Sequence, residues 1–184
     1  MKTIGILMGG YSGEYEVSIA SGNVVYRNLQ GQGYELFRVE LKKNQWEALD
    51  DDDNRYPIIT DDFSFLLGDR KVNFNAVFNA IHGHPGEDGP LAGYFDMLGL
   101  PYTSSGQFAS ALTFNKAECN IILERYGFAV PKSIFLHAEP NLSEEEIIAR
   151  LGLPCFVKPC RSGSSIGVSK VNKPEELKPA IEKA

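Results

Sequence analysis

The stretch from Lys158 to Val171, KPCRSGSSIGVSKV, carries residue types that could bind a phosphate. Two apolar, strand-like pieces flank a run of Ser and Gly, and a lysine stands at its root. Backbone N–H groups in such a loop can form an anion nest, Gly163 permits close approach, and Ser164 and Ser165 add hydroxyl donors. Composition alone nevertheless favours an ordinary surface hairpin with a solvated lysine, because Ser/Gly hairpins are common. The G-x-x-x-x-G-K-[ST] and G-x-G-x-x-G motifs are both absent.

A second polar stretch, HGHPGEDG, follows the apolar run Ala76–Ile81. His82 and His84 have the spacing of some metal sites. No carboxylate or thiol cluster with ligand spacing joins them, so we expect no metal. Two interpretations stay open: an ordinary turn organised by Pro and Gly, or a functional loop that collects titratable side chains at the end of a strand.

Three other charged features fit ordinary structural roles. Glu14 and Glu16 stand at the start of an expected helix, where the helix dipole favours acids. A functional role requires one of them to face a cleft instead. Lys116 stands on an expected helix, where a solvated lysine is the default. Asp50–Asp53 indicates a solvated turn, because it lacks the spacing of a calcium loop.

The elements that would position these residues alternate between strand and helix over the first half of the chain. Thr3–Met8 predicts a buried strand, Ser12 is the expected N-cap of the helix that follows, and Glu35–Leu41 predicts a second strand. The polar stretch 44–54 predicts a hairpin or loop, and Ala76–Ile81 a third strand. This alternation predicts an α/β fold with a doubly wound, mostly parallel sheet over residues 1–105. Ligands of such sheets sit beyond the carboxyl ends of the strands, where Gly9–Glu14 and His82–Gly89 fall.

A second, α+β unit is expected over residues 106–184. We predict helices over Ala109–Tyr126, closed by Gly127, over Ser143–Leu151 with a Ser143/Glu146 capping box, and from Pro174 to Lys183. Strands are predicted at Ser133–His137, Cys155–Lys158 and Gly167–Val171. So few strands make a thin unit, and we expect this domain to be incomplete.

Composition excludes several classes of protein. The chain has 184 residues, of which 43% are hydrophobic and 23% charged, as in a globular protein with a core. A net charge of −6 argues against a nucleic-acid partner. No apolar run approaches a membrane span of about 20 residues. The odd number of cysteines, without framework spacing, predicts reduced thiols and a cytoplasmic location.

Three stretches in this order resemble the D-alanine–D-alanine ligases of bacterial cell-wall synthesis, which are ATP-grasp enzymes. They are LMGGYSGEYEVSIASG, FNAIHGHPGEDGPLAGYFDMLGLPYTSSGQFASALTFNK and LGLPCFVKPCRSGSSIGVSKV. The resemblance runs from Ile4 to about Val171 and is poorest over Lys42–Lys71. It implies a pre-ATP-grasp domain followed by a truncated ATP-grasp subdomain.

The resemblance also implies substrate-binding roles near the start of the chain. Glu14 resembles the catalytic carboxylate that holds the ammonium group of the first D-alanine, and His82 resembles the histidine lining the same subsite. Val17 and Ser18, in the same E-x-E-V-S motif, are implied as substrate-binding residues.

Nucleotide-binding roles are implied further along the chain. Lys116 and Lys158 resemble the two lysines that contact the phosphates of ATP, and Phe156 falls close to the adenine position. Ser164 resembles the catalytic serine that hydrogen-bonds to the glutamate across the cleft. The ATP-binding set implied by the resemblance is Lys116, Phe156, Lys158, Gly163, Ser164 and Ser165. Cys160 and Ser162 depart from the usual pattern, so nucleotide affinity could differ.

The implied reaction uses ATP and Mg²⁺ to phosphorylate the carboxylate of one D-alanine. The amine of a second D-alanine then attacks the acyl phosphate and expels phosphate. The magnesium ligands of the family lie in a third domain, so we expect no metal ligand, and no complete activity, in these 184 residues. The resemblance also implies a homodimer for the complete enzyme. Two alternatives stay open: a ligase for another acceptor, such as D-lactate or D-serine, and a non-catalytic nucleotide- or amino-acid-binding module.

Overall fold

The structure is a computed structural model that describes residues 1–137 and 142–184. Its chain divides into two compact units, Met1–Ala111 and Leu112–Ala184. Each unit has its own cluster of buried apolar side chains, so each is described by itself.

The first unit is built on a five-stranded sheet. In sheet order its strands are β4 (Arg55–Pro57), β3 (Gln45–Leu49), β2 (Tyr34–Lys42), β1 (Lys2–Gly9) and β7 (Ala76–Asn79). Strand β1 pairs in parallel with β2 and β7, whereas β2, β3 and β4 pair antiparallel. The predicted α/β class is therefore confirmed, and the sheet is mixed. The antiparallel edge arises because residues 43–44 alone join β2 to β3, and so short a turn can only form a hairpin.

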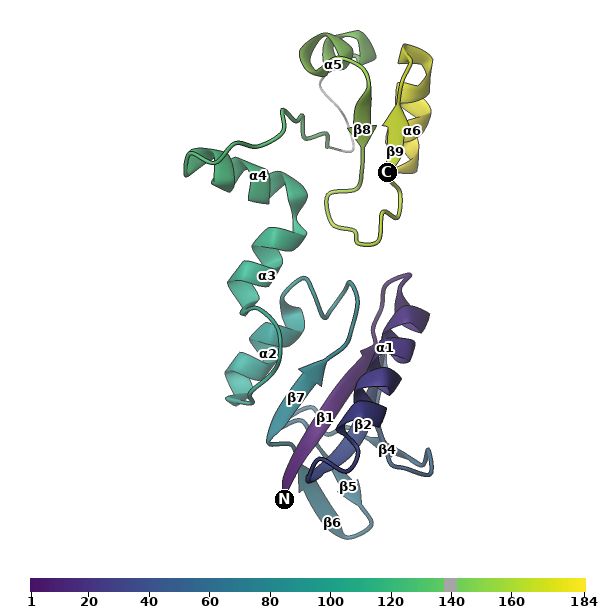
Figure 1. Ribbon diagram of the computed structural model, residues 1–184, viewed down its shortest axis with the longest axis vertical. Coiled ribbons are helices and arrows are strands. Elements are labelled where there is room, and N and C mark those ends of the chain that lie inside the picture. The colour runs from purple at the N-terminus through teal and green to yellow at the C-terminus, as the bar shows by residue number, and fades with distance from the viewer. Residues whose placement is uncertain (138–141) are drawn as a thin grey trace. The chain divides into compact units, whose positions relative to one another are not determined.

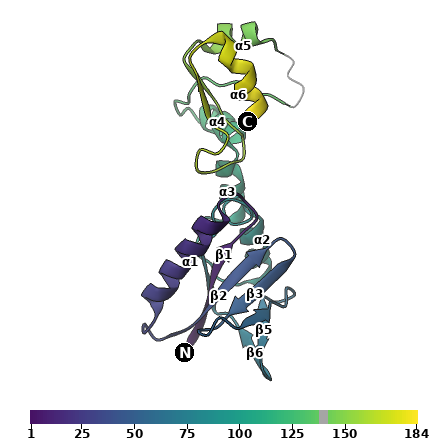
Figure 2. The same cartoon turned by 90° about the vertical axis from the view of Figure 1, so that its right-hand side faces the viewer.

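Two layers cover this sheet, one on each face (Figures 1 and 2). Helix α1 (Tyr15–Leu29) packs on the face that carries Met8, since a Cβ added at Gly22 would lie 2.7 Å from the Met8 Cβ. The opposite face carries Leu7, which shares a buried cluster with Phe95 of α2 (Pro90–Leu98). The same cluster includes Phe65 from the two-stranded hairpin of β5 (Ser64–Leu67) and β6 (Arg70–Asn73). This hairpin was not predicted from the sequence.

The two loops predicted to hold functional residues follow β1 and β7, at the edge of the sheet where ligands of such folds bind. Strands β1 and β7 are parallel neighbours, so the loops after them begin at the same edge of the sheet. The backbone N–H of Tyr11 in the first loop donates to the carbonyl of His84 in the second, at 2.9 Å. Gly9–Glu14 and His82–Gly89 are thus brought together as predicted.

The predicted helix over Ala109–Tyr126 is wrong at one residue. Asn115 separates α3 (Gln107–Phe114) from α4 (Lys116–Arg125). Its backbone is extended, and its side chain accepts a hydrogen bond from the N–H of Glu118 as an N-cap. A side chain that caps a new helix competes with continuation of the old one. Gly127, with φ of +84°, closes α4 as predicted.

The second unit contains a two-stranded sheet of β8 (Cys155–Val157) and β9 (Ser169–Val171). The predicted strand Ser133–His137 is wrong, because this extended segment pairs with no strand. Its alternation instead reflects packing: Ile134 and Leu136 contact the buried cluster, while Phe135 is half exposed.

Helices α5 and α6 complete the second unit. Helix α5 (Glu144–Leu151) begins with the predicted capping box, in which Ser143 accepts from the Glu146 N–H and the Glu146 carboxylate accepts from the Ser143 N–H. The predicted helix over Pro174–Lys183 starts with a 3₁₀ turn (Pro174–Glu176) and continues as α6 (Leu177–Lys183).

Candidate functional sites

Glu14 stands at the start of α1, in the N-cap position, and is only 6% exposed. Ser12 was the expected cap, and this prediction is wrong, because the helix begins three residues later. The Ser12 hydroxyl instead accepts from the Glu14 N–H at 3.1 Å and donates to the His82 carbonyl at 2.8 Å. Glu16, the other acid of this segment, is exposed. The two acids therefore differ in exposure: Glu14 is buried beside the second loop, whereas Glu16 faces solvent.

Glu14 and His82 are neighbours through Gly83. A Cβ added at Gly83 would lie 2.8 Å from the Ser12 Oγ and 3.3 Å from the Glu14 Oε2. The φ of Gly83 is +71°, which also favours glycine. The ring of His82 contacts α1, where its Nε2 lies 3.1 Å from the Oγ of Ser21. The Glu14 carboxylate therefore lies beside the segment His82–Gly83, while the His82 ring extends toward Ser21.

Val17 and Ser18 of the same helix differ in accessibility. The Val17 side chain is 55% exposed and can contact a ligand. Ser18 is fully buried, and its hydroxyl accepts from the Gly9 N–H at 2.9 Å and donates to the Ala80 carbonyl at 2.8 Å. Its expected contact with a substrate is therefore corrected: Ser18 ties the ends of β1 and β7 together, and its hydroxyl is already used.

The acids of the HGHPGEDG loop organise the loop itself. The Glu87 carboxylate accepts from the Gly83 N–H at 2.7 Å, and the Asp88 carboxylate lies 2.7 Å from the Nδ1 of His84. These contacts answer the question left open for Glu87 and Asp88 in favour of a turn. His82 differs, because its ring points to α1 rather than into the loop.

A charged cluster at Glu40 secures the start of α1, and the sequence analysis missed it. The Tyr15 hydroxyl donates to Glu40, which also pairs with Lys42 at 2.9 Å and with Arg55 at 2.6 Å. Burial favours the neutral carboxyl, but the hydrogen bonds from Tyr15, Lys42 and Arg55 outweigh it and lower the pKa of Glu40 to about 2. Burial and the adjacent carboxylate raise the pKa of Tyr15. A charged residue within an alternating strand gives no sequence signal for this role.

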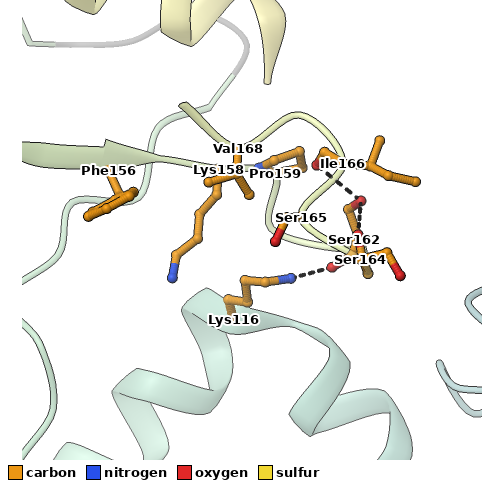
Figure 3. A pocket seen from close by; sticks show the side chains of 10 residues that line it. Lys116, Phe156, Lys158, Pro159, Ser162, Ser164, Ser165, Ile166 and Val168 are labelled. Atoms are coloured by element: carbon orange, nitrogen blue, oxygen red, sulfur yellow. Dashed lines mark hydrogen bonds between the residues drawn. The ribbon is translucent and has the colours of Figure 1, made fainter. Parts of the chain in front are cut away.

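The second unit holds a pocket of about 380 Å³ beside the Ser/Gly loop (Figure 3). Two lysines, the loop and several apolar side chains form its lining. The residues are Lys116, Phe156, Lys158, Pro159, Ser162, Gly163, Ser164, Ser165, Ile166 and Val168. All six residues implied as ATP-binding by the sequence are therefore in one lining, and the sequence analysis missed Pro159, Ile166 and Val168.

The cationic side chains of this pocket come from different elements. Lys158 follows β8 and extends toward α4, whereas Lys116 begins α4 and reaches the loop, where its Nζ donates to the Ser162 carbonyl at 2.5 Å. The Lys116 N–H also donates to the Cys160 carbonyl at 3.1 Å. The thiol of Cys160 donates to the Asn115 side chain at 3.3 Å. These three contacts join the root of the loop to the first turn of α4.

The tip of the loop has an unusual backbone. Ser164 and Ser165 have φ of +43° and +57°, in the left-handed region that serine rarely adopts. Successive backbone N–H groups in a turn can form an anion-binding nest, so the tip of this loop can offer backbone donors. Phe156 and Ile166 are 62% and 49% exposed and add apolar surface. The pocket thus combines cations, N–H donors and apolar surface, which suits an organic polyphosphate.

Residues 1–137 and 142–184 show neither a metal-ligand cluster nor a membrane-spanning helix. Within these residues no group of three or more His, Cys, Asp or Glu side chains is arranged to hold a metal ion. None of their helices has both the length and the apolar character that a membrane span needs. The three cysteines form no disulfide.

Comparisons with known proteins give the same family for both units. A family model described as the N-terminus of D-ala D-ala ligase matches residues 3–105, and a model of the C-terminus of the same ligase matches residues 122–184. A D-alanine–D-alanine ligase of Flavobacterium johnsoniae is 47% identical over the whole of this chain, which covers 57% of that relative. The chain belongs to the D-alanine–D-alanine ligase family, and it spans about half the length of the curated relatives it matches.

Solved structures agree with this membership. The VanG D-Ala:D-Ser ligase from Enterococcus faecalis superposes with a TM-score of 0.83 at 32% identity, over 100% of this chain and 59% of its own. A D-alanine–D-alanine ligase from Bacillus anthracis complexed with ATP superposes with a TM-score of 0.74 at 29% identity, over 99% of this chain and 55% of its own.

Proposed function

We propose that this chain supplies the amino-acid and nucleotide subsites of a ligase that joins two D-alanines at the expense of ATP, for peptidoglycan synthesis. Residues 1–105 form the amino-acid domain in this proposal, and residues 106–184 form part of the nucleotide domain. Family membership supports the reaction class. The single observation that carries the nucleotide assignment is the pocket that gathers both lysines, Phe156 and the Ser/Gly loop.

Lys116 and Lys158 are the proposed phosphate ligands. Each contributes a positive charge from a different element, and a polyphosphate has enough oxygens to bind both. The left-handed backbone at Ser164 and Ser165 adds N–H donors, and Gly163 permits close approach. Phe156 offers an exposed aromatic face for the base. ATP fits this set because the lysines and the N–H groups can bind its phosphates, and the aromatic face of Phe156 can contact its base.

Glu14 is the proposed ligand of the ammonium group of the first D-alanine. A carboxylate that is only 6% exposed can bind an ammonium group with little competition from water. The imidazole of His82 borders the same backbone segment and is the proposed second wall. Val17 lies three residues after Glu14, on the same face of α1, and its exposed side chain can contact a methyl group.

ATP supplies the phosphoryl group that makes the D-alanine carboxylate reactive. The residues of this chain hold charge and exclude water around that transfer: the two lysines stabilise negative charge at the phosphates, and the loop covers them. Ser164, exposed on the loop, is the proposed catalytic serine. The described residues do not offer a ligand set for Mg²⁺, so no step is assigned to that ion.

A ligase with a different acceptor is the second candidate. The likeness to the D-Ala:D-Ser ligase at 32% identity favours it, since that relative carries the same fold over this entire chain. Both candidates share the first D-alanine and the nucleotide, and differ only in the amine that attacks. A homodimer of the complete enzyme also remains a proposal, as does a non-catalytic binding module.

Titration of the chain with ATP tests the nucleotide assignment. We expect Lys158→Ala to weaken ATP binding by about 10- to 100-fold, the usual cost of a lost charge-assisted contact. Lys178→Ala on α6 is the matched control, because it removes an equal charge from the same unit outside the pocket lining. Unchanged affinity in Lys158→Ala would remove this lysine from the site.

A chimera tests the reaction. Residues 1–184 replace the matching segment of the Flavobacterium johnsoniae ligase, which is 47% identical throughout. We expect ATP-dependent dipeptide formation from D-alanine, and loss of it in Glu14→Gln. Mixed D-alanyl-D-serine product from the two amino acids would favour the second candidate. Nucleotide binding without any product would favour the binding module.

A further inference from the structure

Helix α1 presents a row of serines to the end of β7. Ser18 donates to the Ala80 carbonyl at 2.8 Å, and Ser21, three residues later on the same helix face, lies 3.1 Å from the Nε2 of His82. Ser18 fixes the backbone just before His82, whereas Ser21 contacts the ring itself. Neither the sequence motifs nor the proposed ligand contacts give Ser21 a role.

His82 is held at two separate points. The Ser12 hydroxyl donates to its backbone carbonyl at 2.8 Å, and Ser21 bonds to its ring. The first contact fixes where the residue lies, and the second fixes the rotation of the imidazole. A hydroxyl both donates and accepts, so Ser21 can bond to Nε2 in either neutral tautomer of the ring. Ser21 can therefore set the orientation of the ring.

We propose that Ser21 is a positioning residue of the amino-acid subsite, acting on the ligand through His82. The inference rests on the proposed role of His82 as a wall of that subsite. Ser21 is partly buried and contacts the ring nitrogen, so it holds the imidazole of His82 in one orientation. Without Ser21 the ring can rotate, and D-alanine must then fix it on binding.

Nuclear magnetic resonance of the imidazole nitrogens tests this directly on the free chain. The sequence contains three histidines, so His84→Gln and His137→Gln variants assign the His82 signals. We expect Ser21→Ala to shift and broaden the ring signals of His82 alone, because Nε2 loses its hydrogen bond and the ring is no longer held in one orientation. Ser21→Thr, which keeps the hydroxyl, restores the wild-type pattern. Val24→Ala, one turn further along α1 and 49% exposed at that position, leaves it unchanged.

Ligand titration forms the second arm. We expect D-alanine to bind Ser21→Ala about three- to tenfold more weakly than the wild type, as for loss of one neutral hydrogen bond, with ATP affinity unchanged. Ser21→Cys, similar in volume with a poor hydrogen-bonding group, provides a second variant if Ser21→Ala unfolds. Fluorescence of Trp46, the single tryptophan, reports folding of the first unit.

The magnetic resonance experiment and the ligand titration together distinguish failure of the Ser21 inference from failure of the proposed subsite. Unchanged His82 signals in both Ser21→Ala and Ser21→Cys overturn the inference. Altered His82 signals in a chain whose wild type binds no D-alanine contradict the proposed subsite, while the control of the ring by Ser21 stands. Equal loss of D-alanine and ATP affinity indicates a general structural effect, and overturns the positioning role.

Discussion

The two candidate sites of this chain are built in opposite ways. In the first unit, Glu14 is 6% exposed, Ser18 is fully buried, and Gly83 has no room for a side chain. In the second unit, Lys158 and Ser165 are exposed and surround an open pocket. The first site is packed before any ligand arrives, whereas the second depends on a loop held by a few polar contacts.

This difference matches the proposed ligands. D-alanine is small, so its recognition needs groups fixed by packing, because one misplaced group is a large share of the contacts. A nucleotide is large and multiply charged, and a loop that closes over it can exclude water after binding. Substitutions in the first site should therefore reduce folding stability, and those in the second should mainly reduce ligand affinity.

Gly83→Ala is the strongest test of the packed site. The added Cβ would lie 2.8 Å from the Ser12 side chain, at a φ of +71°. We expect a loss of about 3 kcal/mol in the free energy of unfolding, from overpacking together with backbone strain. Urea titration followed by Trp46 fluorescence measures it in the first unit. Gly31→Ala is the control, because it shares a positive φ of +75° with nothing within 4 Å of the new Cβ. Equal losses in both variants would show that strain alone, and not packing, limits this site.

Glu40→Gln is expected to have the next largest effect. It breaks contacts of a buried carboxylate with Tyr15, Lys42 and Arg55, which we expect to cost about 2 kcal/mol at pH 7. The pKa of Glu40 falls from 4.5 to about 2 on folding, so its stabilisation is complete above pH 4.5 and is lost as the pH falls toward 2.

Unfolding midpoints of the wild type and Glu40→Gln should therefore converge between pH 4.5 and pH 2. Glu16→Gln serves as the control, since Glu16 is an exposed acid of α1, the helix whose start the Glu40 cluster secures. A constant difference between wild type and Glu40→Gln across this range would contradict the role of the ionised carboxylate.

Cys160→Ala should have the smallest effect on stability, and it tests the open site. The thiol is a weak donor, so its loss should change the free energy of unfolding by less than about 1 kcal/mol. The loop root loses a contact with Asn115, and we expect ATP affinity to fall about two- to fivefold. Cys160→Ser should retain both properties, and Cys119→Ala on α4 is the matched control. A stability loss as large as that of Gly83→Ala would remove the contrast between the two sites.

Much of the fold could be predicted because local patterns agree with tertiary structure. The apolar run Thr3–Met8 and the alternation of Glu35–Leu41 identified β1 and β2, and the Ser143 capping box located α5. The break at Asn115 was missed because the apolar periodicity continues across it. Ser133–His137 alternates like a strand, but alternation reports only which side chains are buried, and no neighbouring backbone pairs with it.

The candidate sites were predicted residue by residue only where a motif stands in the sequence. Lys116 and Lys158 lie 42 positions apart, and their shared pocket depends on the hairpin between β8 and β9. Ser18 was expected at the substrate, yet its hydroxyl is used by two backbone groups. Glu40 and Ser21 were missed, since a charge in a strand and a serine in a helix carry no signal until the partner is known.

The contact between Lys116 and the Ser162 carbonyl has a consequence for selectivity. The ammonium group of Lys116 already donates to a neutral carbonyl oxygen when no ligand is bound. An incoming anion must replace that carbonyl, so its binding free energy includes only the difference between the charged and the neutral acceptor. In the proposed nucleotide site, a single phosphate would gain little from this exchange, whereas a chain of phosphates would also engage Lys158 and the amides at the tip. We therefore expect the resting contact to favour a polyphosphate over a single phosphate.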